Sequence, residues 1–258
     1  VPECWADWVV RPEEGIVLVA LVDETVVGTC YIHFLTDGQC WFQALRVHPG
    51  HRRAGVGSAL TERALTEAHH DGRRVAYLGI DADNPASLTM TARAGFRQIT
   101  AYRRLHADVS SGSSIGSWRT ATADDAPLIF AEMSMQAERC GYPQAFFMSW
   151  EWQELSPAAI SSAIERQGLW IWESDNAVVV AGLDFYDEEV GLFAPAYLRK
   201  VDLVNALQAL PPLAMEKGAK RLELWLPFSD QSITELIEHF GFRGEPDDGY
   251  TIWSYTLR

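Results

Sequence analysis

Cysteine is scarce in this sequence, and its few cysteines follow no paired pattern. Among 258 residues there are four, Cys4, Cys30, Cys40 and Cys140. No Cys-x-x-Cys pair occurs and no histidine stands at the spacing of a zinc ligand, which argues against a disulfide framework and against a structural zinc site. We predict reduced, mostly buried thiols and no bound metal.

Long apolar runs are also missing. The best one, residues 16–22, stops at Asp23 and Glu24 and is typical of a buried strand. A helix that crosses a bilayer needs about 20 apolar residues in a row. No secretory signal pattern is present either. We therefore expect a cytoplasmic protein with no membrane partner.

Positive charge is in short supply, and its distribution is uneven. The chain holds 21 basic against 35 acidic residues, net −14, which argues against a nucleic-acid partner because phosphate neutralisation needs a basic face. Residues 1–107 are nearly neutral, with eleven arginines against twelve acids, whereas residues 118–258 hold ten basic residues against twenty-two acids. The two halves of the chain therefore differ in charge. Because 48% of its residues are apolar, the chain is expected to fold.

The segment between these halves, residues 108–117, is rich in serine and glycine and is the best linker candidate. On either side of it the same order of elements recurs at an offset of about 150 residues. The matching features are hairpins at 15–34 and 168–185, Val-His-Pro49 and Phe-Ala-Pro195, helices ending at Gly72 and Gly218, strands at 74–80 and 221–226, and Gly-Phe pairs at 95–96 and 241–242. Chance rarely produces such a repeat, so we predict a duplicated domain, with copies at 1–107 and 118–258.

The second copy has an opening that the first lacks. A strand is expected at 117–122, then a helix capped by Asp124 or Asp125, and a further helix from about Ser156. The first copy begins almost directly with its hairpin. Either it is natively short, or an N-terminal strand and helix are absent from this sequence.

The segment 45–60 carries the clearest functional signal. A strand ends at Val47, Pro49 blocks its continuation, and Gly55 and Gly57 begin a helix. Without Cβ atoms, the amides of a first helical turn are open to an anion, and the preceding arginines add positive charge. The glycines could also merely open a surface helix. The order of strand, proline, basic pair and helix favours a pyrophosphate cradle.

These residues resemble a known family. Arg52-Arg-Ala-Gly-Val-Gly57 fits the (Arg/Gln)-x-x-Gly-x-(Gly/Ala) signature of the GNAT superfamily of acyl-CoA-dependent N-acyltransferases, and Leu45-x-Val47-x-Pro49 fits the strand before it. Asn84-Pro-Ala-Ser-Leu88 and Ala94-Gly-Phe96 are similar to the next motif of that family. The resemblance covers residues 15–106. Over 117–258 it rests on element order and the second Gly-Phe pair.

The resemblance implies an α/β fold with a mixed sheet, in two GNAT-like domains in tandem, the first without its N-terminal strand and helix. Its fourth and fifth strands would splay apart around acyl-CoA, most simply acetyl-CoA, and a neutral amine would attack the thioester directly. The pantetheine arm would pair with the backbone of Leu45, Arg46 and Val47 and with Asn84. The residues implied at the pyrophosphate are Arg52, Arg53, Ala54, Gly55, Val56, Gly57 and Ser58.

Two departures from the family leave the catalytic groups open. Where many members carry a tyrosine acid, this chain has Thr91, and near a frequent glutamate base it has Gln43. The candidates for catalysis are therefore Gln43, Asn84 and Thr91, acting by positioning or through water. Possible substitute groups, each with an ordinary structural explanation, are His33, His48, Asp81, Asp83 and Tyr102.

The second copy lacks both cradle glycines. At the aligned place it has bulky residues and Asp202, whose charge would repel phosphate, although Arg199 and Lys200 remain. We predict that it binds acyl-CoA poorly. Its seven tryptophans either fill the core or, together with acids at 184 and 187–189, line a pocket for a cationic amine.

The sequence thus favours an N-acetyltransferase whose N-terminal copy acts on a primary amine of a small molecule, of cationic kind if the acidic pocket exists. Alternatives are a non-catalytic acyl-CoA sensor or scaffold, and acetylation of a protein N-terminus or lysine. A third alternative, a protein with a purely structural role in interactions, agrees least with an intact anion-binding loop. Because tandem copies can satisfy each other's contacts, a monomer is expected.

Overall fold

The computed structural model of the chain describes residues 4–109, 117–140, 143–148, 150–174, 177–186, 189–193, 205–227, 241–244 and 249–257. The chain divides into two compact units, residues 1–99 with 251–258, and residues 100–250. The first unit therefore combines the two ends of the sequence, whereas the sequence suggested copies at 1–107 and 118–258. Most of the expected linker, residues 110–116, lies outside the described residues.

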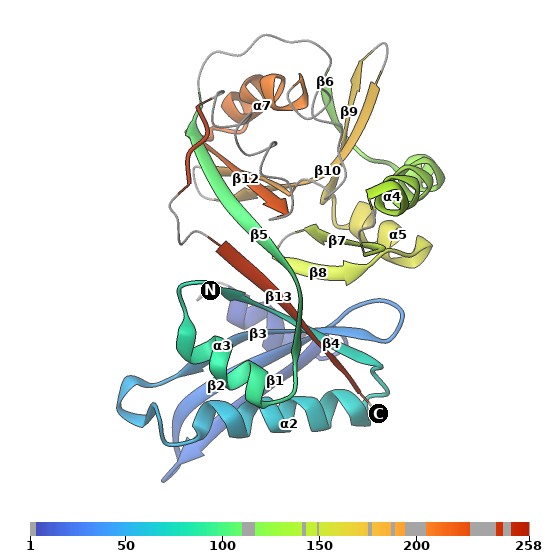
Figure 1. The fold of residues 1–258 in the computed structure, drawn as a ribbon. Coiled ribbons are helices and arrows are strands. Elements are labelled where there is room, and N and C mark those ends of the chain that lie inside the picture. The colour runs from blue at the N-terminus through green and yellow to red at the C-terminus, as the bar shows by residue number, and fades with distance from the viewer. Residues whose placement is uncertain are drawn as a thin grey trace. The chain divides into compact units, whose positions relative to one another are not determined.

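The first unit is a mixed sheet with helices (Figure 1). Its strand order is β1-β2-β3-β4-β13; the pairs β1–β2 and β2–β3 are antiparallel and β3–β4 is parallel, as the predicted fold class requires. Its elements are α1 (Cys4–Val10), β1 (Gly15–Val22), β2 (Thr25–Phe34), β3 (Gln39–Val47), η1 (Pro49–His51), α2 (Val56–His70), β4 (Val75–Asp81), α3 (Pro85–Arg93), the start of β5 (Arg97–Asp108), and β13 (Gly249–Thr256). The sequence did not suggest α1.

The core of this unit lies between the sheet and α2. Alternate residues of β2 and β3, among them Cys30 and Cys40, pack beneath Leu60, Ala64 and Ala68 of α2. Burial in this apolar layer raises the pKa of both thiols to about 12. The expectation of buried, unpaired thiols is confirmed for these two cysteines.

The last strand of the chain completes this sheet. The hydroxyl of Thr251 donates to the carbonyl of Ile80 at 2.9 Å, and the amide of Leu257 donates to the carbonyl of Arg74 at 3.0 Å. The Tyr255 ring packs on Phe96 with 5.3 Å between ring centroids. The C-terminal strand is thus part of the unit that carries the predicted cradle.

The second unit repeats the pairing pattern of the first. Its strand order is β5-β12-β11-β10-β9-β6; β9, β10 and β11 are antiparallel, and β11–β12 is parallel, like β3–β4. Its elements are the rest of β5, β6 (Ser117–Thr120), η2 (Ala123–Asp125), α4 (Ala126–Cys140), β7 (Ala145–Met148), β8 (Glu151–Glu154), α5 (Pro157–Glu165), β9 (Leu169–Ser174), β10 (Ala177–Tyr186), β11 (Glu189–Phe193), α7 (Leu210–Glu216) and β12 (Arg221–Pro227).

The predicted opening of the second copy agrees with this order. Strand β6 is followed by η2 and α4, and Ser156 caps α5 by accepting a hydrogen bond from the amide of Ala159 at 3.0 Å. The small hairpin β7–β8 was not foreseen. In the described parts of the chain, none of the helices is both long and apolar enough to cross a membrane.

Candidate acyl-CoA site

The parallel strands β3 and β4 separate before either one ends. They pair from Gln39 and Val75 to Phe42 and Leu78, but β3 continues to Val47 and β4 to Asp81. The parting coincides with a bulge in the β2–β3 ladder, where three steps along β3 match two along β2. At this bulge Ala44 has φ 55° and its carbonyl accepts a hydrogen bond from the Thr29 hydroxyl at 3.2 Å. Such a separation of neighbouring strands is what the family resemblance implied.

The loop after β3 is tied down by local hydrogen bonds. Pro49 begins the short helix η1, the Nδ1 atom of His48 accepts from the Gly50 amide at 3.2 Å, and Nε of Arg52 donates to the Val47 carbonyl at 3.3 Å. Arg53 then takes a left-handed conformation with φ 62°. These contacts turn the chain sharply from the end of β3 into α2.

Helix α2 begins with open amides. Its N-cap residue, Gly55, has φ 85° and no capping side chain, and the amide of Ala59 donates to the Gly55 carbonyl at 3.0 Å. The amides of Val56, Gly57 and Ser58 precede that bond, so they have no acceptor within the helix. Together with the helix dipole they favour an anion at this position.

The two glycines serve different purposes. A Cβ on Gly55 would meet nothing within 4 Å, so its left-handed backbone is what calls for glycine. A Cβ on Gly57 would lie 3.0 Å from Sδ of Met90 in α3. Gly57 therefore lets α2 and α3 approach closely, which refines the sequence-based explanation for this position.

A cavity of about 910 Å³ opens at this helix start. It is lined by ten of the eleven residues predicted to bind the cofactor, all except Ala54. The lining residues are Leu45, Arg46, Val47, His51, Arg52, Arg53, Gly55, Val56, Gly57, Ser58, Asn84, Ala86, Ser87, Thr89, Met90 and Arg93. Residues from three separate stretches of sequence thus meet in one pocket.

The charge of this pocket is one-sided. Four arginines, Arg46, Arg52, Arg53 and Arg93, line it, and none of the described residues that line it is acidic. The sequence did not predict Arg93 or His51 as cofactor-binding residues. Arg93 is the last residue of α3, and only the packing of α3 beside α2 brings it to the cradle.

Asn84 has a structural role as well as a place in the pocket. Its Oδ1 accepts a hydrogen bond from the Ser87 amide at 3.1 Å and caps α3, whose first residue is Pro85. With the acceptor atom engaged, the donors of its side-chain amide are the groups that can serve a ligand.

The other two candidates for catalysis do not line the pocket. Gln43 is half-buried on β3 opposite Tyr31, and Thr91 is only 2% exposed within α3. Among the substitute groups, His48 is held by the Gly50 amide, and Tyr102 packs on Phe147 in the second unit with 4.9 Å between ring centroids. The remaining three substitute groups do not line the pocket either. They are His33 on β2, Asp81 at the end of β4, and Asp83 in the turn that follows.

Some of the residues predicted to matter in the second copy lie within the described ranges and others do not. Arg199, Lys200 and Asp202, at the place of the cradle, lie outside the described residues, as do Asp187 and Glu188. Four of the seven tryptophans are at most 8% exposed, namely Trp152, Trp170, Trp172 and Trp225. These four fill the core, which was the first of the two alternatives that the sequence left open.

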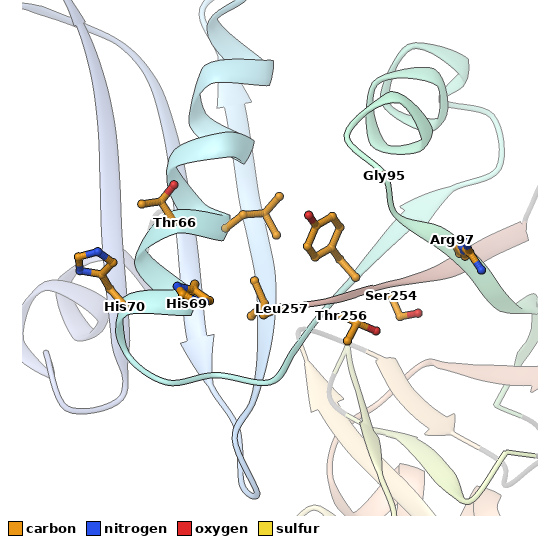
Figure 2. Close-up of a pocket in the computed structure, with 10 residues that line it drawn as sticks. Thr66, His69, His70, Gly95, Arg97, Ser254, Thr256 and Leu257 are labelled. Atoms are coloured by element: carbon orange, nitrogen blue, oxygen red, sulfur yellow. The ribbon is translucent and has the colours of Figure 1, made fainter.

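A second cavity of the first unit, about 670 Å³, lies between the end of α2 and the end of β13 (Figure 2). It is lined by Leu65, Thr66, His69, His70, Gly95, Arg97, Ser254, Tyr255, Thr256 and Leu257. No sequence pattern indicated this cavity, because its two walls are almost two hundred residues apart in the chain. In the described ranges no group of three His, Cys, Asp or Glu side chains is placed to hold a metal ion.

Comparison with known proteins agrees with this geometry. Residues 1–96 match the family model of the acetyltransferase (GNAT) family. The match agrees with the predicted family and enzyme class over residues 1–96, which belong to the first unit. A search of curated proteins found no match for the sequence.

Solved structures extend the likeness of fold over both units. A GCN5-related N-acetyltransferase from Sphaerobacter thermophilus is 13% identical, covers 100% of this chain and 87% of its own, and has a TM-score of 0.66. A tandem GNAT protein from the clavulanic acid biosynthesis pathway, solved without acetyl-CoA, is 16% identical over 95% of this chain and 84% of its own, with a TM-score of 0.57. A GCN5-related N-acetyltransferase from Kribbella flavida is 18% identical, with coverages of 100% and 64% and a TM-score of 0.55.

Proposed function

We propose that the first unit binds acetyl-CoA and transfers its acetyl group to a primary amine of a small molecule. The supporting observation is the arginine-lined pocket that joins the free edge of β3, the open amides of α2 and Asn84. Acyl transfer by direct attack needs a bound thioester beside a space that an amine can enter. We assign this activity to residues 1–107 together with β13, and none to the second copy.

Each wall of the pocket has a distinct part in binding. The edge of β3 facing β4 is unpaired after Phe42, so the backbone of Leu45 and Arg46 can hold the amides of the pantetheine arm as an added strand would. The carbonyl of Val47 already accepts from Arg52, which fixes that arginine near the diphosphate position. The amides of residues 56–58 and the arginine side chains neutralise the diphosphate.

The chemistry then rests on positioning. A neutral amine attacks the thioester carbonyl, the bond to sulfur breaks, and CoA leaves as the thiol after it receives a proton. Neither Gln43 nor Thr91 can supply or remove a proton at neutral pH. We propose that water passes the amine proton on, and that Gln43 and Asn84 position the reactants rather than titrate.

The proposal is tested by following the release of CoA thiol from acetyl-CoA with a panel of amines. Gly55→Ala places a side chain at a left-handed residue in the cradle, and we expect kcat/KM to fall roughly tenfold or more because the anion site shifts. Gly72→Ala is the matched control. It sits at the other end of α2 with φ 74°, and its Cβ would also meet nothing within 4 Å. Equal losses in both variants would contradict the assignment.

The non-catalytic sensor remains the competing function, because Thr91 is buried and neither it nor Gln43 lines the pocket. Tight acetyl-CoA binding without thiol release for any amine, including a peptide N-terminus and a lysine peptide, would favour the sensor. Turnover with a peptide alone would favour protein acetylation. A cationic acceptor predicts that substrate affinity falls as salt rises.

A further inference from the structure

The second cavity of the first unit is separate from the acyl-CoA pocket. The two cavities share no lining residue, and every residue that lines the second one belongs to the first unit. One wall is the last part of α2, from Leu65 to His70, the opposite wall is Gly95 with Arg97, and residues 254–257 lie between them (Figure 2). Its volume of about 670 Å³ is typical of small-molecule sites, which measure about 300–1,000 Å³. The proposed acetyl transfer gives this cavity no role.

The charge of this cavity is one-sided. Its ionisable lining residues are His69, His70, Arg97 and Tyr255, and none of the described residues that line it is acidic. Arg97 is exposed, and among the described residues it has no ion-pair partner. A guanidinium that is not engaged elsewhere can bind a carboxylate through two parallel hydrogen bonds. In a chain of net charge −14, a cavity with only basic ionisable groups and a tyrosine favours an anion.

The end of α2 does not oppose an anion at this place. Three carbonyls of its last turn accept hydrogen bonds from the backbone amides of residues 71–73, at 2.9 to 3.0 Å. The acids of this turn are also engaged, since Glu67 forms an ion pair with Arg63, and Asp71 accepts from Nε of Arg73 at 2.7 Å. Neither acid lines the cavity. The negative groups at the helix end are therefore already compensated.

The basic groups stand at the two ends of the cavity. Figure 2 shows His70 and Arg97 far apart in the view, with Leu257 between them. Leu65 and Leu257 both line the cavity, and both are half-buried against the core beneath α2. The cavity therefore offers apolar surface between two ends that can each bind a negative group.

We propose that this cavity binds a linear dicarboxylate. Arg97 holds one carboxylate, His69 and His70 donate hydrogen bonds to the other, and the hydrocarbon chain lies along Leu257. An imidazole has an N–H donor in its neutral form as well as in its charged form. A singly charged carboxylate matches one arginine at one end and two imidazoles at the other, whereas a doubly charged phosphate would be left partly uncompensated at either end.

The probe for this proposal is a series of linear dicarboxylates from succinate to suberate, titrated into the full chain and followed by proton–nitrogen correlation spectra. We expect saturable shifts at the amides of residues 65–70, 95–97 and 254–257. Affinity should pass through an optimum with chain length, because only a chain that spans the cavity reaches both ends. Hexanoate, which has a single carboxylate, is the matched ligand control and should bind about tenfold more weakly than adipate, the scale of one charge-assisted hydrogen bond.

Two variants should weaken the binding of adipate by about tenfold each, namely Arg97→Gln and the double variant His69→Gln with His70→Gln. Arg11→Gln is the matched control. Arg11 is an exposed arginine of the same unit that pairs with Glu14 at 3.2 Å and does not line the cavity, so adipate affinity should not change. Thermal melting of each variant shows whether it is folded.

Four results would overturn the proposal. One is the absence of saturable shifts for every dicarboxylate. Another is equal affinity for hexanoate and adipate. The third is inorganic phosphate that binds this cavity more tightly than any dicarboxylate. The last is a loss of adipate binding in Arg53→Gln but not in Arg97→Gln, which would mean that the dicarboxylate occupies the acyl-CoA pocket. None of these measurements needs acetyl-CoA, so the proposal and the proposed acetyl transfer can fail independently.

Discussion

Gly57 and Met90 meet where two helices that line the proposed acyl-CoA pocket come together. The helices belong to different motifs of the sequence, and the space in the pocket depends on how closely α2 approaches α3. A single side-chain atom at position 57 would meet the end of Met90 at 3.0 Å, a distance that forces one of them to shift. The pocket is therefore sensitive to the size of the side chain at position 57, although Gly57 itself has no left-handed backbone conformation.

At this scale we predict that Gly57→Val destabilises the first unit by about 1–3 kcal/mol through overpacking and weakens acetyl-CoA binding. The double variant Gly57→Val with Met90→Ala should recover most of the stability, because the space given up by Met90 takes the valine. Urea denaturation and calorimetric titration with acetyl-CoA measure the two effects. Additive losses in the double variant would mean that the contact does not limit the packing.

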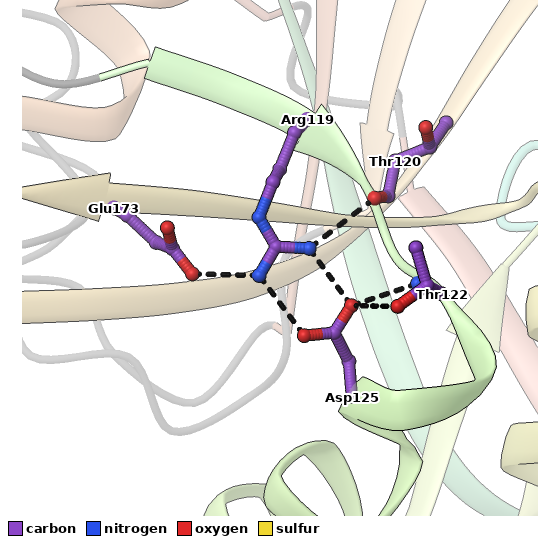
Figure 3. Close-up of polar contacts among 5 residues, drawn as sticks. All are labelled: Arg119, Thr120, Thr122, Asp125 and Glu173. Carbon is purple, nitrogen blue, oxygen red and sulfur yellow. Dashed lines mark hydrogen bonds and ion pairs between the residues drawn. The ribbon is translucent and has the colours of Figure 1, made fainter.

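Among the elements, the start of α4 is fixed by a polar network (Figure 3). The carboxylate of Asp125 accepts hydrogen bonds from the Thr122 amide and hydroxyl, each at 2.8 Å, and from both terminal nitrogens of Arg119 at 2.8 and 2.9 Å. Arg119 also donates to Glu173. The Arg119 guanidinium, with the Thr122 donors, holds the pKa of Asp125 well below its usual range. One carboxylate therefore caps a helix and links it to β6.

We predict that Asp125→Asn costs about 1 kcal/mol at pH 7, mainly by weakening the cap, since the partly exposed Arg119 pair adds little. Because the folded pKa is depressed, this stabilisation is present above about pH 4 and is lost as the pH falls below it. Urea denaturation at pH 7 and at pH 3 should show the gap between wild type and variant closing. Asp124→Asn, one residue earlier and exposed, should show no such gap at either pH.

For the whole molecule, the decisive feature is that the first unit needs the last strand. Strand β13 bonds to β4 and packs Trp253 and Tyr255 onto the core beneath α2, and Leu257 directly after the strand packs there too. A fragment cut at the predicted boundary would leave β4 without this neighbour and would expose part of that core.

We therefore predict that a fragment of residues 1–107 does not fold to a stable unit, whereas the same fragment regains structure and acetyl-CoA binding when a peptide of residues 249–257 is added. Circular dichroism and thermal melting of the fragment, with and without the peptide, provide the measurement. A scrambled peptide of the same composition is the control. A cooperative melt of the fragment alone would show that β13 is dispensable.

Much of the site was predictable because its signals are local. Pro49, the glycines of the loop and the arginines before them stand within ten residues, and short-range sterics and helix-end electrostatics act over that distance. The strand-by-strand repeat was predictable for the same reason, since alternation and turn residues are read within each hairpin. Arg93, the second cavity and the short helix α1 were not, because none has a distinctive pattern at its own position.

The sequence by itself determined the near-neutral charge of the half that carries the motif, and it predicted the cradle, the order of the elements and the duplication. Only the tertiary structure decided that β13 belongs to the first unit, that Gly57 serves packing, and that Thr91 is buried and does not line the pocket. The physical reason is the range of the interactions involved. Conformational preference and charge act between neighbours in the chain, whereas strand pairing and burial are settled by residues such as Thr251 and Ile80, which are 171 positions apart.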